Sequence, residues 1–165
     1  MEAMDLTVQE VVERDTSEMQ GKYLTFWTDK QLFGISICDV MQIVGMQEIT
    51  SVPEFPYYAK GIINLRGSII PVIDARLRLG KPETAYNERT CIIVTDIQEH
   101  FVGFIVDEVD AVTQISDDQI APPPTLSGMA DGYLTGIGKL EDRVVLLVDT
   151  FKIVGADDMK LLAAG

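Results

Sequence analysis

The stretch GISICDV, residues 34–40, recurs 69 residues further along the chain as GFIVDEV, residues 103–109. Further positions keep this spacing or, past a longer loop in the second copy, a spacing of 75: Ile43 with Val112, Pro53 with Pro122, Gly61–Ile62 with Gly136–Ile137, Leu65 with Leu140, Val72 with Leu147, Asp74 with Asp149 and Gly80 with Gly155. Gly, Pro and Asp are favoured at positions with particular backbone geometry. Their shared register therefore indicates a duplicated unit rather than chance similarity between strand-rich segments.

Each copy predicts the same series of short strands, closed by a helical turn. Apolar alternation between turn residues places the expected strands at 22–28, 31–43, 61–65 and 68–73, and again at 89–95, 101–115, 133–140 and 144–148. Asp74 and Asp149 are the expected helix caps, with Gly80 and Gly155 as the stops. Four or five short strands per copy suit a small barrel, which buries little surface alone, so two barrels should share a core.

The repeat also sets the expected domain limits. We expect a flexible acidic tail at residues 1–21, a first barrel at 22–86, a second barrel at 87–155 and a C-terminal tail at 156–165. The N-terminal tail carries 6 acidic residues and 1 basic residue, and its apolar content is low. We therefore expect that deleting residues 1–18 leaves the melting temperature nearly unchanged.

Composition narrows the class of protein. The 165 residues are 47% hydrophobic and carry a formal net charge of −13. The chain has 17 Ile and 16 Val against 13 Leu and 10 Ala, a balance that favours strands. A chain this acidic repels phosphate groups, so binding to nucleic acid or to an anionic membrane surface is disfavoured. We find no signal peptide, and no apolar run long enough to insert in a bilayer.

The sequence offers little for catalysis or for metal binding. Cys38 and Cys91 lie in strand-like runs and are expected to be core residues in a reducing cytosol. The single histidine, His100, lies in a polar stretch that predicts a hairpin tip. No nucleophile elbow, phosphate-binding loop or zinc motif is present. No catalytic residue, metal site or cofactor is therefore predicted.

Charge differs between the two copies. Residues 22–86 have 7 basic and 6 acidic side chains, whereas residues 87–155 have 4 basic and 12 acidic ones. Similar scaffolds with different surface charge suggest a different partner for each half, although drift on solvated surfaces explains the difference equally well.

The motif Lys60-Gly61-Ile62-Ile63-Asn64-Leu65-Arg66-Gly67, followed by Pro71-Val72-Ile73-Asp74, resembles the CheW family of bacterial chemotaxis adaptors. The resemblance extends over residues 20–155 and includes the runs 103–109 and 133–138. It departs at Ala75, where the family usually has a larger aliphatic residue.

The resemblance implies two five-stranded SH3-like barrels around a shared core, with no catalysis. It further implies a cytoplasmic protein at receptor arrays, which couples the cytoplasmic tip of methyl-accepting chemotaxis receptors to the histidine kinase CheA. The expected contact on that kinase is a regulatory domain with the same double-barrel fold.

Carried over by position, the resemblance implies a receptor-binding groove between the barrels, formed by Val40, Ile43, Gly61, Asn64, Arg66, Ile92 and Val112. Val40 and Ile43 should then leave apolar surface exposed, and Val40→Glu should weaken receptor binding. Arg66 is either an anchor that holds loop carbonyls or a solvated turn residue. Kinase-binding residues are not assigned by any motif.

Two alternatives stay open. The chain could be a regulatory domain of a CheA-like kinase or the adaptor half of CheV, although a start at Met1 without a kinase or receiver segment favours a free-standing adaptor. A small acidic enzyme is the third reading, and no sequence motif supports it.

Overall fold

The computed structural model describes residues 6–7, 20–124, 132–155, 158–160 and 162. Its described elements run in the order β1 (Leu6–Thr7), β2 (Lys22–Thr28), β3 (Gln31–Ser36), η1 (Ile37–Asp39), β4 (Val40–Gly45), β5 (Ala59–Leu65), β6 (Ser68–Asp74), α3 (Ala75–Arg78), β7 (Cys91–Ile97), β8 (His100–Val106), β9 (Glu108–Gln114), η2 (Asp117–Gln119), β10 (Ile120–Ala121), β11 (Leu134–Lys139), β12 (Val144–Val148) and α4 (Thr150–Val154). Strands dominate and the helices are short, so the all-β expectation is confirmed.

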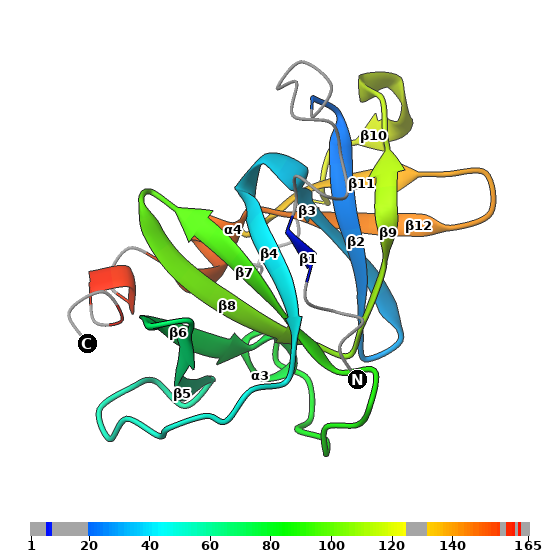
Figure 1. Ribbon diagram of the computed structural model, residues 1–165. Helices are drawn as coiled ribbons and strands as arrows, with labels where there is room; N and C mark the ends of the chain where they lie inside the picture. The colour runs from blue at the N-terminus through cyan, green and yellow to red at the C-terminus, as the bar shows by residue number, and fades with distance from the viewer. Residues whose placement is uncertain (1–5, 8–19, 125–131, 156–157, 161, 163–165) are drawn as a thin grey trace.

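The described strands form two six-stranded sheets, and each sheet takes strands from both repeats (Figure 1). Sheet A has the order β1-β4-β7-β8-β6-β5, and sheet B has the order β10-β11-β12-β3-β2-β9. The expected limits of the barrels, 22–86 and 87–155, therefore separate the two repeats but not the two sheets. The β2–β3 hairpin of the first repeat completes the sheet of the second, and the β7–β8 hairpin of the second completes the sheet of the first.

A break in two expected strands explains this exchange. The chain at 31–43 is not one strand, because the 3-10 turn η1 separates β3 in sheet B from β4 in sheet A. The Ser36 hydroxyl accepts a hydrogen bond from the Cys38 N–H, which caps this turn. A bend at Asp107 divides 101–115 in the same way, into β8 in sheet A and β9 in sheet B.

Equivalent contacts in the two sheets confirm the repeat. Gly34 pairs in parallel with Leu147, and Gly103 pairs in parallel with Val72, its partner in the other repeat. Neither glycine has room for a side chain, since an added Cβ would lie within 3.0 Å of neighbouring valine and leucine or isoleucine carbons. The caps match as well: the Asp74 carboxylate accepts from the Leu77 N–H and the Asp149 carboxylate accepts from the Lys152 N–H.

Each sheet curls so that its two ends approach one another. Beyond β4, Thr50 forms a bridge to Ile62 of β5, the strand at the far end of sheet A. In sheet B the chain leaves the edge strand β9 and joins the opposite edge as β10, which pairs with β11. This closure gives each sheet a separate interior.

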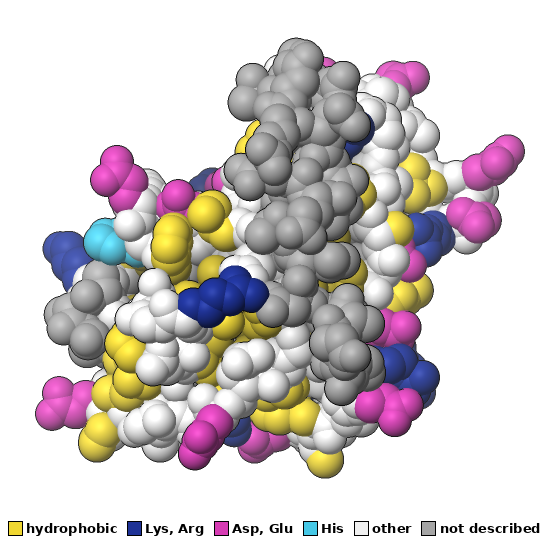
Figure 2. Space-filling model, viewed as in Figure 1, with side chains coloured by type: hydrophobic (Ala, Val, Ile, Leu, Met, Phe, Trp, Pro, Cys, Tyr) yellow, Lys and Arg dark blue, Asp and Glu magenta, His cyan; other side chains and the backbone are white. Residues whose placement is uncertain are grey.

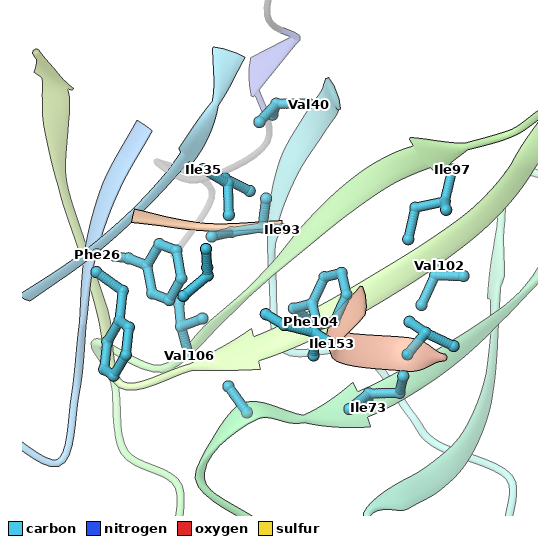
Figure 3. Close-up of a cluster of buried hydrophobic side chains, with 14 of the residues drawn as sticks. Phe26, Ile35, Val40, Ile73, Ile93, Ile97, Val102, Phe104, Val106 and Ile153 are labelled. Carbon is cyan, nitrogen blue, oxygen red and sulfur yellow. The ribbon is translucent and has the colours of Figure 1, made fainter. Parts of the chain in front are cut away.

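Buried side chains of the described residues form a large shared cluster and two smaller ones. The shared cluster takes Phe26, Phe33 and Ile35 from sheet B and Ile73, Ile93 and Phe104 from sheet A. Figure 3 shows side chains of this cluster, with Phe26, Ile35, Ile93 and Phe104 among those labelled. The smaller clusters fill the interiors of sheet A, around Val72 and Ile92, and of sheet B, around Val145 and Leu147. The shared core expected from the repeat is confirmed.

The chain ends depart from the expected tails. Leu6 and Thr7 form β1, which pairs antiparallel with β4, so the expectation of a flexible tail through residue 21 is wrong at these two residues. Met159 and Leu162, in the expected C-terminal tail, are buried in the shared cluster. The remaining residues of the two expected tails lie outside the described residues, apart from 20–21, 158 and 160.

Candidate functional site

Val40 and Ile43 lie on β4, and Val112 lies on β9. β4 and β9 occupy equivalent positions in the two repeats, each with a bulge in its pairing, and their side chains reach the same shared cluster. Val40 is 4% exposed and Ile43 is 7% exposed, so neither leaves the open apolar surface that we expected. Val112 is half-buried against that cluster.

Met41 is the side chain of β4 that does reach solvent. It is 42% exposed and occupies the bulge between Val40 and Gln42. The sequence alone did not single out Met41, because a bulge reverses the inside–outside alternation from which exposure was judged. β4 and β9 reach the shared cluster from different sheets, and we refer to the outer faces of these two strands together as the β4–β9 surface.

Ile92 does not belong to this surface. It lies on β7 opposite Val44, is fully buried, and packs in the interior cluster of sheet A. The family resemblance placed it in the groove, but its side chain packs in the interior of sheet A. Its role is in packing.

Gly61 is a point of close backbone approach. Its φ is +146°, and an added Cβ would lie 2.1 Å from the carbonyl oxygen of Thr50. That contact sits at the Thr50–Ile62 bridge, which closes sheet A. The fold thus requires glycine at position 61, and a purely backbone role is one that the sequence left open for it.

Asn64 and Arg66 form the turn of the β5–β6 hairpin. Arg66 and Gly67 have φ values of +53° and +93°, and the Asn64 side chain accepts a hydrogen bond from the Gly67 N–H at 2.9 Å. In sheet A this hairpin and β4 are separated by β7 and β8. Val40, Ile43 and Ile92 are buried, so the seven predicted residues do not form one exposed groove.

A second apolar surface was missed by the sequence reasoning. Ile69 is 54% exposed and Phe101 is 40% exposed, and both line an open groove with Ile62, Pro71 and His100. Figure 2 shows exposed hydrophobic side chains beside the single histidine, drawn in cyan. We call this the Ile69 groove. Its residues come from β5, β6 and β8, from Glu99 in the turn before β8, and from Met159 and Leu162 near the C-terminus. These segments are distant in the chain, so no sequence motif marks the groove.

Charged side chains of the second repeat are partly neutralised inside the molecule. Arg76 pairs with Asp107 at 2.9 Å, and Arg143 pairs with Asp110 at 2.8 Å. Burial raises the pKa of Asp110, but hydrogen bonds from Thr25 and Arg143 outweigh it, so the net pKa lies below its ordinary value. The acidic excess of this repeat is thus partly used within the fold rather than for a partner.

The positions of Cys91 and His100 bear on the chemistry open to these side chains. Burial raises the pKa of the Cys91 thiol to about 11, which disfavours the nucleophilic thiolate. His100 is exposed at the start of β8, next to the hairpin turn, as predicted. Among the described residues we find no group of three or more His, Cys, Asp or Glu side chains placed to hold a metal ion. No helix in the described part of the chain is long and apolar enough to cross a membrane.

Residues 22–158, which include both sheets and both repeats, match the family described as CheW-like domain. The chain belongs to this family. It is 35% identical over 142 residues to the chemotaxis protein CheW of Klebsiella aerogenes, which covers 86% of each chain. It is 34% identical to the chemotaxis protein CheW of Bacillus subtilis, over 78% of this chain and 83% of that one.

A solved CheW structure has the same fold. The crystal structure of scaffolding protein TtCheW from Thermoanaerobacter tengcongensis matches with a TM-score of 0.73 and 36% identity. The match covers 78% of this chain and 88% of that one. The β4–β9 surface and the Ile69 groove therefore lie on a CheW-like fold in which the two repeats exchange strands.

Proposed function

We propose that this CheW-family chain is a non-enzymatic adaptor that couples the cytoplasmic tip of chemoreceptors to the histidine kinase CheA. The observation that carries the proposal is the family match over residues 22–158. Its curated relatives are named chemotaxis protein CheW, and the solved relative is named a scaffolding protein. We place the adaptor in the cytoplasm, bound to receptor arrays at the inner face of the membrane.

The receptor tip is proposed to bind the β4–β9 surface. β4 and β9 both reach the shared cluster at the junction of the two sheets, and Met41 offers an exposed apolar side chain there. Exposed apolar side chains rimmed by polar ones suit an amphipathic helical partner. An anchoring role for Arg66, at the β5–β6 turn, stays a prediction.

The kinase regulatory domain is proposed to bind the Ile69 groove. Ile69 is 54% exposed and Phe101 is 40% exposed, and both line this groove, so a partner that binds there would bury their apolar surface. The groove is built from sheet A, whereas an equivalent exposed apolar residue, Val144, lies on β12 of sheet B. The two surfaces allow the adaptor to hold both partners at once.

The test measures each affinity separately by calorimetry, with a receptor cytoplasmic fragment and with the isolated CheA regulatory domain. Met41→Glu should weaken receptor binding at least tenfold and leave kinase binding unchanged, because a charge must be desolvated at the interface; ~1.4 kcal/mol corresponds to that factor. Ile69→Glu should have the opposite selectivity. Val144→Glu, at the equivalent position of the other repeat and 54% exposed like Ile69, is the matched control and should bind both partners normally.

Val40→Glu is not a clean test, in contrast to the expectation from the sequence. Val40 is buried in the shared cluster, so a charge there would destabilise the fold and weaken both interactions together. Circular dichroism of Met41→Glu and Ile69→Glu checks that those variants stay folded. Wild-type protein that binds neither partner would refute the proposed function.

A further inference from the structure

Arg78, the last residue of α3, reaches the closing helix of the other repeat. Its Nε donates a hydrogen bond to the carbonyl oxygen of Ile153 in α4. The last carbonyls of a helix have no partner within that helix, so a cation with an N–H donor suits this end of α4. The contact joins equivalent positions of the two repeats, because Ile153 lies 75 residues after Arg78.

Two tyrosines surround the same guanidinium. The Arg78 Cζ lies 5.3 Å from the ring centroid of Tyr58 and 5.9 Å from that of Tyr133, distances at which a cation is attracted to an aromatic face. The two tyrosines are themselves equivalent, because the carbonyl of each accepts the N–H of the helix cap of its own repeat, Asp74 or Asp149, at 2.8 Å. The closing helices of the two repeats therefore meet at one arginine.

The end of α4 that Arg78 holds leads into one side of the Ile69 groove. Gly155 follows α4 with a φ of +88°, and its carbonyl accepts a hydrogen bond from the Met159 N–H at 2.9 Å. Met159 and Leu162 line the groove together with Ile69, and in Figure 1 this part of the chain, drawn in red, lies beside β6 and β8. We call these two residues the C-terminal wall. The wall is not part of a strand of sheet A, so its position depends on how α4 is held.

We propose that Arg78 is a positioning residue for the Ile69 groove: by holding the end of α4 it fixes the C-terminal wall and so sets the affinity for the kinase regulatory domain. This inference rests on the proposed binding of that domain in the groove. Without the guanidinium, the Ile153 carbonyl loses this donor and the two tyrosine rings lose their shared cation. The rest of the groove belongs to paired strands of sheet A and to the β7–β8 turn, so the effect should be confined to the wall.

The first experiment measures both affinities by calorimetry in variants of the full chain. Arg78→Leu removes the charge and the donor, and it should weaken binding of the CheA regulatory domain at least fivefold while binding of a receptor cytoplasmic fragment changes less than twofold. Arg78→Lys keeps a charge and a donor, and it should bind the kinase domain within threefold of wild type. Lys152→Leu removes the same charge from an exposed position on α4, so it is the matched control and should bind both partners like wild type.

The lysine variant and the second partner distinguish positioning from a general loss of stability. Loss of stability alone would weaken both interactions together, whereas a displaced wall weakens only the one with the kinase domain. An Arg78→Leu protein that binds the kinase domain like wild type, or that loses both partners equally, would overturn the proposal. A lysine variant as weak as the leucine variant would also overturn it, because charge and donor would then not be what Arg78 contributes.

Amide hydrogen exchange tests the wall directly, without any partner. Exchange at Met159 should be at least tenfold faster in Arg78→Leu than in wild type, because its N–H is bonded to Gly155 at the released end of α4. Exchange at Ile93, on a strand of sheet A that is paired on both sides, should change by a much smaller factor. Equal exchange at Met159 in the two proteins, or equal acceleration at Met159 and Ile93, would overturn the role of Arg78. Faster exchange at Met159 with a wild type that does not bind the kinase domain would instead refute the proposed function on which the inference rests.

Discussion

Single residues with unusual backbone angles hold the closed sheets together. Gly61 approaches the Thr50 carbonyl at the bridge that closes sheet A, and Gly67 completes the β5–β6 turn with positive φ. These two glycines differ in their surroundings: an added Cβ meets backbone at Gly61 and nothing within 4 Å at Gly67. Alanine substitution at the two positions therefore separates the cost of backbone strain from the cost of steric overlap.

Gly61→Ala should destabilise the protein far more than Gly67→Ala does. The Gly61 Cβ would overlap the Thr50 oxygen at 2.1 Å, which forces the backbone apart, and we expect a loss of about 3 kcal/mol or more. Gly67→Ala adds only left-handed strain, which costs about 1 kcal/mol. Urea unfolding of both variants gives the comparison. Equal losses would show that Gly61 is needed for its backbone angle and not for space.

The two cysteines should differ sharply in reactivity. Cys38 is exposed, whereas Cys91 is buried and its thiol pKa is raised to about 11. At pH 8 a maleimide should label Cys38 in native protein and reach Cys91 only after urea is added. Cys38→Ser serves as the control, and native labelling of that variant at the denatured rate would contradict the buried assignment.

The same pKa has a consequence for stability above pH 9. The folded state holds the Cys91 proton more tightly than the unfolded chain does, because burial raises the pKa of this thiol. Below pH 9 both states are protonated and the thiol has no effect on the pH dependence of stability. As pH rises from about 9 toward 11 the unfolded chain loses this proton first, so the free energy of unfolding falls.

At the scale of elements, charged side chains join segments of different sheets. Arg76 follows β6 of sheet A, and it contacts Asp107 in the β8–β9 bend and Asp29 in the β2–β3 turn of sheet B. The Asp29 N–H donates to the same Asp107 carboxylate at 2.8 Å. This arrangement fixes the α3 turn against the hairpin that crosses from one repeat to the other.

Arg76→Lys should cost about 1 kcal/mol in the free energy of unfolding. Arg76 donates from Nε and Nη2 to the two oxygens of Asp107, at 3.0 and 2.9 Å, and an ammonium cannot reproduce this planar fork. Arg89→Lys is the control, because Arg89 pairs with Glu108 at 3.8 Å and both side chains are largely exposed. We expect less than about 0.5 kcal/mol for that variant. Urea unfolding at low and high salt measures both, and equal effects would place Arg76 among ordinary surface charges.

At the scale of the whole molecule, the exchange of hairpins makes the two repeats depend on one another. β2 pairs with β9, β3 with β12, β4 with β7 and β6 with β8, and each of these pairs joins strands from different repeats. The shared cluster joins the two sheets in addition. Unfolding should therefore be a single cooperative event rather than the loss of one barrel after the other.

Fragments 20–86 and 87–165 should not fold separately. The first fragment keeps two hairpins and a lone β4, and isolated hairpins are marginally stable in water. Circular dichroism should show a cooperative melt for the full chain and none for either fragment. An equimolar mixture should regain part of the native signal. A fragment that melts cooperatively by itself would show that the repeat, and not the sheet, is the folding unit.

The repeat, the all-β class and the family could all be predicted from the sequence. Gly34 with Gly103 and Asp74 with Asp149 predicted equivalent contacts, because a close approach and a helix cap each demand one residue type at a fixed backbone position. His100 is exposed and Cys91 is buried, as predicted, but Cys38, which was expected in the core, is exposed at the η1 turn.

Which strands share a sheet follows from the tertiary structure and not from local sequence patterns. Residues 31–43 and 101–115 look like continuous strands because local alternation says nothing about the bends at η1 and Asp107. Once those bends send β4 and β9 into the opposite sheets, Val40, Ile43 and Ile92 become buried and Met41 becomes exposed. Exposure, and with it the candidate binding surfaces, depends on contacts between strands that are distant in the sequence, which no local pattern encodes.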